Sequence, residues 1–208
     1  MKRFSKPVII STFAVILVMI LASIELLNWS DYLLHQVGTL LFLLMMLGAY
    51  RYWHISSKSY VLASLFLLIH IIGARYLYSY VPYDDWTQQL FNVELSTLFG
   101  WQRNMYDRLV HFSYGLLLFS AMFESLRYIL KIQSLKQLIA LTLMLNMSTS
   151  MLYELIEWDI ATTLSPEAAE AYNGQQGDVW DAHKDMALAL LGGIIAALLY
   201  RVSLTRSS

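Results

Sequence analysis

The chain contains no cysteine, which removes several kinds of site at once. Without a thiol there can be no disulfide bond, no thiolate metal site and no cysteine nucleophile. Charged residues are also scarce, at 14% of the 208 residues, whereas a soluble domain has nearer a quarter. The net charge is −1, so the chain does not have the excess of Lys and Arg that is typical of proteins that bind nucleic acid. These absences favour a protein whose solvent is partly lipid.

Apolar residues make up 58% of the chain, and the mean hydropathy is +0.52. Six apolar stretches approach the roughly 20 residues that a helix needs to cross a bilayer. Each should be helical, because a lone strand exposed to lipid would leave its backbone groups unpaired. The sequence therefore predicts an all-α polytopic membrane protein. It forms a single transmembrane domain over residues 1–208, with six spans near Val8–Leu27, Leu33–Tyr50, Tyr60–Tyr78, Leu109–Tyr128, Leu135–Glu157 and Asp185–Tyr200.

The N-terminal stretch shares one feature with a signal peptide, since Lys2, Arg3 and Lys6 precede its apolar run. The run over Val8–Leu27 is about twice as long as the apolar part of a signal peptide, and no clear small-residue cleavage site follows it. We therefore expect a retained first helix.

Basic and acidic connecting segments alternate along the chain. The basic segments carry Lys2, Arg3, Lys6, Arg51, Lys58, Arg127, Lys131, Lys136, Arg201 and Arg206. By the positive-inside rule both termini are cytoplasmic, and the acidic loops near residues 79–108 and 158–184 lie outside. Loops of this length usually carry function. We expect the first to lie on the bilayer surface as an amphipathic helix, and the second to turn near Asn173 and Gly174.

Ionisable groups at the mouth of a span are costly, so each is a candidate for function. Asp107 and His111 are spaced i, i+4 and share one helix face, which suits a histidine oriented by a carboxylate. We assign them catalytic roles. The alternative is that Asp107 caps the helix and His111 is a buried hydrogen-bonding residue.

Carboxylates also gather at the ends of the last two spans. Glu154 and Glu157 would repel each other unless a cation or a shared proton bridged them, although Glu157 could instead face water. Asp181 and Asp185 stand near the start of the last span, where acids also suit the helix dipole. We predict these four acids as metal ligands. Oxygen ligands with one imidazole suit Mg²⁺, Mn²⁺, Ca²⁺ or Zn²⁺.

Three further residues are candidates for substrate binding: Arg75, Asp178 and His70. A guanidinium such as Arg75 can pair with phosphate or carboxylate, or extend toward water at the membrane surface. Asp178 shares its spacing with Asp181 and Asp185. His70 also fits a purely structural hydrogen bond between helices. The small residues Ala189, Gly193 and Ala197 predict close helix packing and no chemistry.

Three segments resemble the YjdF-like family of uncharacterised bacterial inner-membrane proteins. They begin at Asp107 (DRLVHFSYG), at Tyr153 (YELIEW) and at Gly177 (GDVWDAHKDM). The resemblance implies an inner-membrane location and a shared polar site, and it supplies no reaction. A more distant resemblance is to VanZ-like membrane proteins, which show an Asp and His at one helix start and an Asp in the last helix. The paired acids of residues 154–157 and 178–181 depart from that pattern, so a role in glycopeptide resistance is not carried over.

These residues are consistent with three different functions. The first is a metal-dependent membrane enzyme that acts on an envelope lipid or a lipid-linked phosphate from the outer side. The second is a non-catalytic scaffold or sensor with a structural cation site. The third is a proton- or cation-coupled transporter, which lacks support from an inverted repeat.

Overall fold

The computed structural model describes residues 2–163 and 176–205, and the regular elements in this part of the chain are all helices, without strands. Six long helices carry the fold: α1 (Lys6–Ala22), α2 (Trp29–Tyr52), α3 (Ser57–Arg75), α6 (Tyr106–Leu130), α7 (Leu135–Thr163) and α9 (Asp181–Thr205). Two short helices, α4 (Tyr83–Phe91) and α5 (Leu95–Phe99), connect α3 to α6. The prediction of an all-α polytopic protein is confirmed.

Five of the described helices are long and apolar enough to cross a membrane, namely α2, α3, α6, α7 and α9. Helix α1 is apolar but has 17 residues, a length of about 25 Å at 1.5 Å per residue. It ends at Ala22, before the predicted Leu27. The chain then turns through Glu25, whose φ is 54°, and Asn28 caps the start of α2. That α1 crosses the membrane as a sixth span therefore stays a prediction.

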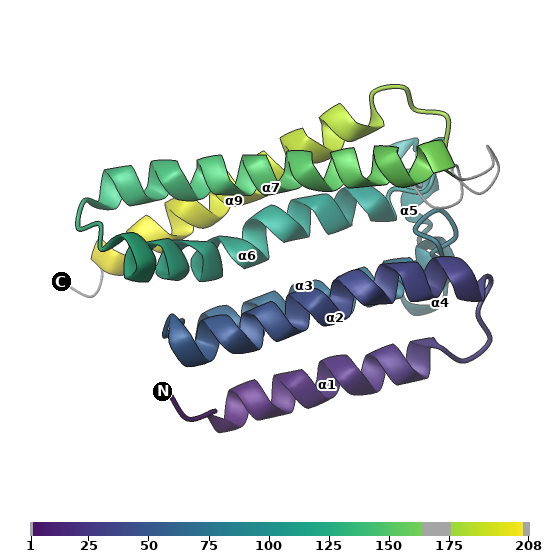
Figure 1. Ribbon diagram of the computed structural model, residues 1–208. Helices are drawn as coiled ribbons and strands as arrows, with labels where there is room; N and C mark the ends of the chain where they lie inside the picture. Colours follow the sequence, from purple (N-terminus) through teal and green to yellow (C-terminus); the bar gives the residue numbers. More distant parts are fainter. Residues whose placement is uncertain (1, 164–175, 206–208) are drawn as a thin grey trace.

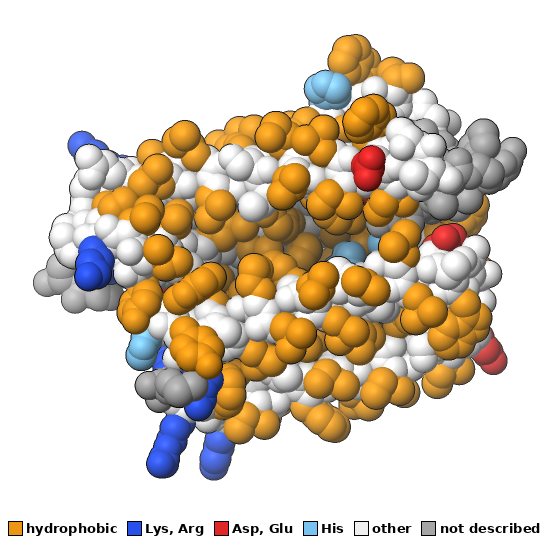
Figure 2. Space-filling view, viewed as in Figure 1, with side chains coloured by type: hydrophobic (Ala, Val, Ile, Leu, Met, Phe, Trp, Pro, Cys, Tyr) orange, Lys and Arg blue, Asp and Glu red, His pale blue; other side chains and the backbone are white. Residues whose placement is uncertain are grey.

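The helices form two groups of three that meet along α3 and α6 (Figure 1). Helix α3 packs against α1, α2 and α6, and α9 packs against α6 and α7. Both termini lie at one end of the bundle, and α4 and α5 lie at the other. On the face shown in Figure 2, Lys and Arg gather at the end with the termini, whereas Asp and Glu lie toward the opposite end.

Helices α6 and α9 approach so closely that two glycines leave no room for a side chain. A methyl group on Gly115 of α6 would lie 1.8 Å from the backbone oxygen of Ala189. One on Gly192 of α9 would lie 2.2 Å from the backbone oxygen of Phe112. Lipid tails are as apolar as the helix surface, so helices associate in membranes through close packing of this kind. The packing role predicted for the small residues of α9 is borne out at Ala189, and the contact holds the first halves of α6 and α9 together.

The two long loops differ in part from expectation. The first contains two short helices in place of one, because the chain turns at Asn92, whose φ is 55°. The turn predicted near Asn173 and Gly174 lies outside the described residues. Helix α7 continues to Thr163, beyond the predicted Glu157.

Candidate functional site

The first turns of α6 place Asp107 and His111 one turn apart, both buried. The Nε2 atom of His111 lies 3.4 Å from Oδ1 of Asp107. Its Nδ1 atom lies 3.7 Å from Oε1 of Glu154, which α7 contributes. The imidazole therefore lies between carboxylates from two helices. Met105 occupies the N-cap position of α6, so Asp107 is not the capping residue.

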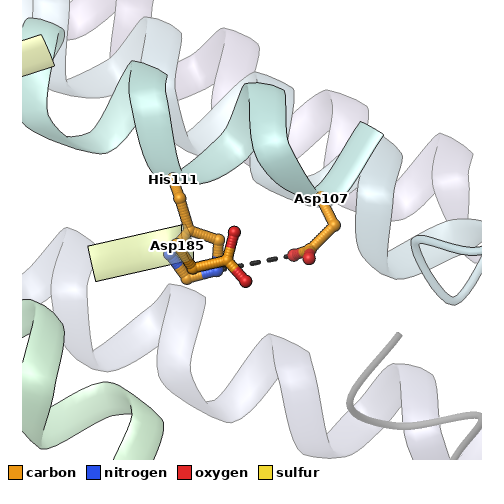
Figure 3. A group of neighbouring side chains, drawn as sticks. All are labelled: Asp107, His111 and Asp185. Atoms are coloured by element: carbon orange, nitrogen blue, oxygen red, sulfur yellow. Dashed lines mark ion pairs between the residues drawn. The ribbon is translucent and has the colours of Figure 1, made fainter. Parts of the chain in front are cut away.

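Asp185 of α9 completes a buried group with Asp107 and His111 (Figure 3). One ligand atom from each residue lies within 4.8 Å of the others. The ligands of a tetrahedral Zn²⁺ are roughly 3.3 Å apart, whereas opposite ligands are about 4.2 Å apart around an octahedral Mg²⁺ and about 4.6–5.2 Å apart around Ca²⁺. Oδ2 of Asp107 and Oδ1 of Asp185 have no hydrogen-bond partner among the described residues. The group therefore has the donor atoms and nearly the dimensions of a site for one cation.

Two arginines border this group, and the sequence analysis did not select either. Nη1 of Arg108 lies 2.5 Å from Oδ2 of Asp185, and its Nη2 lies 2.5 Å from Oδ1 of Asp181. Arg103, in the loop before α6, lies 2.6 Å from the same oxygen of Asp181 and 3.6 Å from Asp107. The guanidiniums join the start of α6 to the start of α9.

Asp178 lies at the outer edge of the cluster, before α9 begins. Its Oδ2 atom accepts a hydrogen bond from Arg108 at 3.1 Å and another from Lys184 at 2.6 Å. The Lys184 ammonium holds the pKa of Asp178 below its usual range, so this carboxylate is charged at neutral pH. The predicted grouping of Asp178, Asp181 and Asp185 is thus found in space, with Arg108 at its centre.

A reciprocal pair of hydrogen bonds joins the segments that precede α6 and α9. The backbone N–H of Asn104 donates to Oε1 of Gln176, and Nε2 of Gln176 donates to the backbone oxygen of Asn104. The hydroxyl of Tyr83 accepts from the backbone N–H of Met105. These contacts tie the segments that precede α6 and α9 to each other.

The remaining predicted residues are not members of the three-residue group, although Glu157 is close enough to interact electrostatically with Glu154 and His111. Glu157 lies on α7 beyond Glu154 and is half-buried. His70 of α3 is hydrogen-bonded to the hydroxyl of Tyr78 at 2.6 Å. Arg75, at the end of α3, donates to the backbone oxygens of Ala22 and Ile24. Of the residues selected from the sequence, the structure therefore gathers Asp107, His111, Glu154, Asp178, Asp181 and Asp185.

Because Arg75 satisfies carbonyls at the end of α1, we expect Arg75→Ala to act on stability and to leave the cluster intact. The loss should be about 1–3 kcal/mol, the usual cost of hydrogen bonds to a charged group. Thermal melting and metal content of the detergent-purified variant measure the two effects separately. A variant that lost metal without losing stability would contradict this structural role.

Sequence reasoning missed a second polar face, on α2. His35, Gln36 and Thr39 are all buried within an otherwise apolar helix. His35 and Thr39 are spaced i, i+4, and that spacing was the available signal. Arg103 and Arg108 flank Asp107 in the sequence, and nothing in their spacing distinguished them from cations at a membrane surface.

Comparison with known proteins supports the resemblance already described. Residues 7–206 match a family described as "Predicted membrane protein (DUF2238)". The chain belongs to this family. The chain is also 30% identical to the inner membrane protein YjdF of Escherichia coli (strain K12), over 95% of this chain and 91% of that protein. No solved structure matches it. Together with its apolar helices, this makes the chain a multi-pass membrane protein, and the predicted YjdF-like family is confirmed.

Proposed function

We propose that this protein is a divalent-metal-dependent enzyme that acts on an envelope lipid or a lipid-linked phosphate. The observation that carries the proposal is the buried group of Asp107, His111 and Asp185, with two carboxylate oxygens that lack a hydrogen-bond partner among the described residues. Oδ2 of Asp107 has only the guanidiniums of Arg103 and Arg108 nearby, at 3.6 and 3.9 Å, which is too far for a hydrogen bond. Buried carboxylate oxygens without hydrogen bonds are costly, and a bound cation would supply the missing interaction.

The charges of the cluster agree with a divalent ion. Five carboxylates take part: Asp107, Glu154, Asp178, Asp181 and Asp185. They face two guanidiniums and the ammonium of Lys184, which leaves an excess of two negative charges when His111 is neutral. The N-terminal ends of α6 and α9 offset part of this excess through their dipoles. One divalent cation would neutralise the remainder.

The proposed reaction is hydrolysis of a phosphate ester. Asp107, His111 and Asp185 would hold the cation, which lowers the pKa of a bound water. A bond forms between the water oxygen and phosphorus, and the bond between phosphorus and the lipid oxygen breaks. Glu154, which lies beside His111, would accept the proton that the water loses and then donate that proton to the departing lipid alkoxide. Arg103 and Arg108 would orient the phosphate oxygens.

We place this site on the periplasmic side of the inner membrane. The relative from Escherichia coli is named an inner membrane protein. Lys and Arg gather at the end of the bundle that holds both termini, and the site is at the other end. Cytoplasmic ends of membrane proteins carry the excess of Lys and Arg, so the positive-inside rule supports this orientation.

The test is the metal content of detergent-purified protein by mass spectrometry. Wild type should hold about one divalent ion per chain, and Asp185→Asn and His111→Ala should lose it. Asp159→Asn is the matched control, because Asp159 is an exposed acid of α7. Release of inorganic phosphate from phosphatidic acid or a polyprenyl phosphate should follow the metal content. Wild type without metal after incubation with Mg²⁺, Mn²⁺, Ca²⁺ and Zn²⁺ in turn would refute the proposal.

A second candidate is a scaffold or sensor in which the cation is structural. It is favoured by the ion pairs of Arg103 and Arg108, which join α6 to α9 and its preceding segment. Under this alternative, removal of the ion by EDTA lowers the melting temperature, and no phosphate is released from any lipid in the presence of the ion.

A further inference from the structure

A pocket of about 550 Å³ opens at the end of the bundle that holds both termini, opposite the metal-ligand group. It lies between the turn that joins α2 to α3 and the last turns of α6 (Figure 1). Its lining includes Trp53, His54, Glu124, Arg127, Tyr128 and Lys131. Small-molecule sites have volumes of about 300–1,000 Å³, so this pocket is large enough for a polar head group. We call it the terminal pocket.

The terminal pocket is lined by two cations that the fold itself does not use. The guanidinium of Arg127 and the ammonium of Lys131 form no hydrogen bond or ion pair with any of the described residues. Two other cations at this end are engaged, since Lys2 donates to the backbone oxygen of Ile55 at 2.7 Å and Arg51 donates to that of Lys2 at 3.2 Å. The positive charges of Arg127 and Lys131 are therefore available to an anion.

The carboxylate in the lining, Glu124, does not neutralise these cations. Its Oε2 atom accepts a hydrogen bond from the backbone N–H of Ser56 at 2.6 Å. Ser56 is the N-cap residue of α3, and the dipole of a helix stabilises a negative charge at that end. Glu124 and Arg127 are spaced i, i+3 on α6, yet the described side chains form no ion pair. The lining thus keeps an excess of positive charge.

The surroundings of the terminal pocket match the boundary between membrane and water. Arg127 is in the last turn of α6, and Lys131 is its C-cap residue. The rings of His54 and Tyr128 lie 5.3 Å apart, and aromatic residues such as Tyr128 are enriched at this level of a membrane. Ile129 and Leu130 are exposed apolar residues on the same turns of α6. An anion in the pocket would therefore have a path for attached acyl chains along α6.

We propose that the terminal pocket binds the phosphate of an anionic phospholipid, such as phosphatidylglycerol, whose acyl chains lie against α6. Arg127 would bind two phosphate oxygens through its planar guanidinium, and Lys131 would add a point charge. Basic pockets beside transmembrane helices suit anionic head groups in this way. The proposal goes beyond the proposed function and does not depend on it, because no residue of the metal-ligand group takes part.

The first experiment measures lipid retention by native mass spectrometry of the detergent-purified chain in EDTA. The protein is mixed with phosphatidylethanolamine and phosphatidylglycerol in equal amounts. Wild type should retain about one phosphatidylglycerol per chain in preference to phosphatidylethanolamine. The double variant Arg127→Gln with Lys131→Gln should bind it about thirtyfold more weakly, because each cation near a membrane surface strengthens the attraction about fivefold. Both side chains are exposed, so the variant should fold, and its melting temperature checks this.

A matched control separates the pocket from the general excess of Lys and Arg at this end, which the positive-inside rule already explains. Lys58→Gln with Lys136→Gln also removes two exposed cations from this end, and neither residue lines the pocket. This control should retain phosphatidylglycerol as wild type does. Equal losses in the two double variants, or no preference of wild type for the anionic lipid, would overturn the proposal.

Inorganic phosphate is the second probe, because it offers the same oxygens without acyl chains. It should not displace phosphatidylglycerol from wild type when the two are present at equal concentration. Displacement at equal concentration would make the terminal pocket a site for a soluble anion and would overturn its assignment to a lipid. All these measurements are made without divalent metal, so a protein that binds no metal and releases no phosphate would refute the enzyme and leave this result unchanged.

Discussion

Gly115→Ala is expected to prevent the close approach of α6 and α9, and with it the formation of the site. The added methyl group would lie 1.8 Å from the backbone oxygen of Ala189 and 2.8 Å from the backbone nitrogen of Gly193. These are backbone atoms, so no side-chain rotation relieves the overlap and the helices must separate. Overpacking commonly costs 1–3 kcal/mol, and a clash with backbone on this scale should cost about 4 kcal/mol or more.

Thermal melting of detergent-purified protein measures the effect, and a fall of roughly 10 °C or more is expected for a chain of this length. Gly192→Ala should behave similarly, because its methyl group would lie 2.2 Å from the backbone oxygen of Phe112. Gly48→Ala is the matched control. It lies within α2 with no atom within 4 Å of the added methyl group, and alanine favours a helix.

The separation of α6 and α9 should also disperse the metal ligands. His111 and Gly115 are one turn apart on α6, and Asp185 and Ala189 are one turn apart on α9. We expect Gly115→Ala to lose metal although it changes no ligand. A variant as stable as Gly48→Ala, with normal metal content, would show that the two helices are not packed as described.

Arg108→Ala should produce the second large effect, because it leaves three carboxylates without their shared partner. Arg108 contacts Asp178, Asp181 and Asp185 at 3.1, 2.5 and 2.5 Å, and its side chain is 12% exposed. Asp181 keeps Arg103 and Asp178 keeps Lys184, at 2.6 Å each, so Asp185 is the carboxylate that loses its cation. Removing one member of a buried ion pair costs about 3–5 kcal/mol, because the remaining charge stays buried without compensation. The melting temperature in detergent should therefore fall by roughly 10 °C.

Two further variants separate the charge of Arg108 from its packing. Arg127→Ala removes an exposed arginine from the other end of α6 and should change stability little. The double variant Arg108→Gln with Asp185→Asn should be more stable than Arg108→Gln alone, because it also removes one uncompensated carboxylate. If the double variant lost the sum of the two single losses, the ion pair between Arg108 and Asp185 would have no energetic role.

The local sequence was enough to predict which segments form helices and which polar residues share a helix face. A run such as that of α2 or α6 must be helical in lipid, because only a helix satisfies its own backbone groups. The i, i+4 spacing also placed Asp107 beside His111 on one face, since the geometry of a single helix decides that distance. Such relations need no knowledge of neighbouring helices, and they are the ones that the structure reproduces.

The local sequence did not show which helices pack against each other. Arg75 and Arg108 are both arginines near the end of a span, yet one satisfies carbonyls at the end of α1 and the other binds the acids before and within α9. The sequence analysis did not select Gln36, which the bundle buries beside His35.

The sequence by itself determined the all-helical class, the membrane as solvent and the pairs of residues that share one helix face. Only the tertiary structure decided that α6 and α9 adjoin and that Arg108 lies among three aspartates. The physical reason is that apolar surface drives helices into lipid without selecting their neighbours. That selection depends on close contacts such as Gly115 against Ala189, which exist only once the helices have assembled.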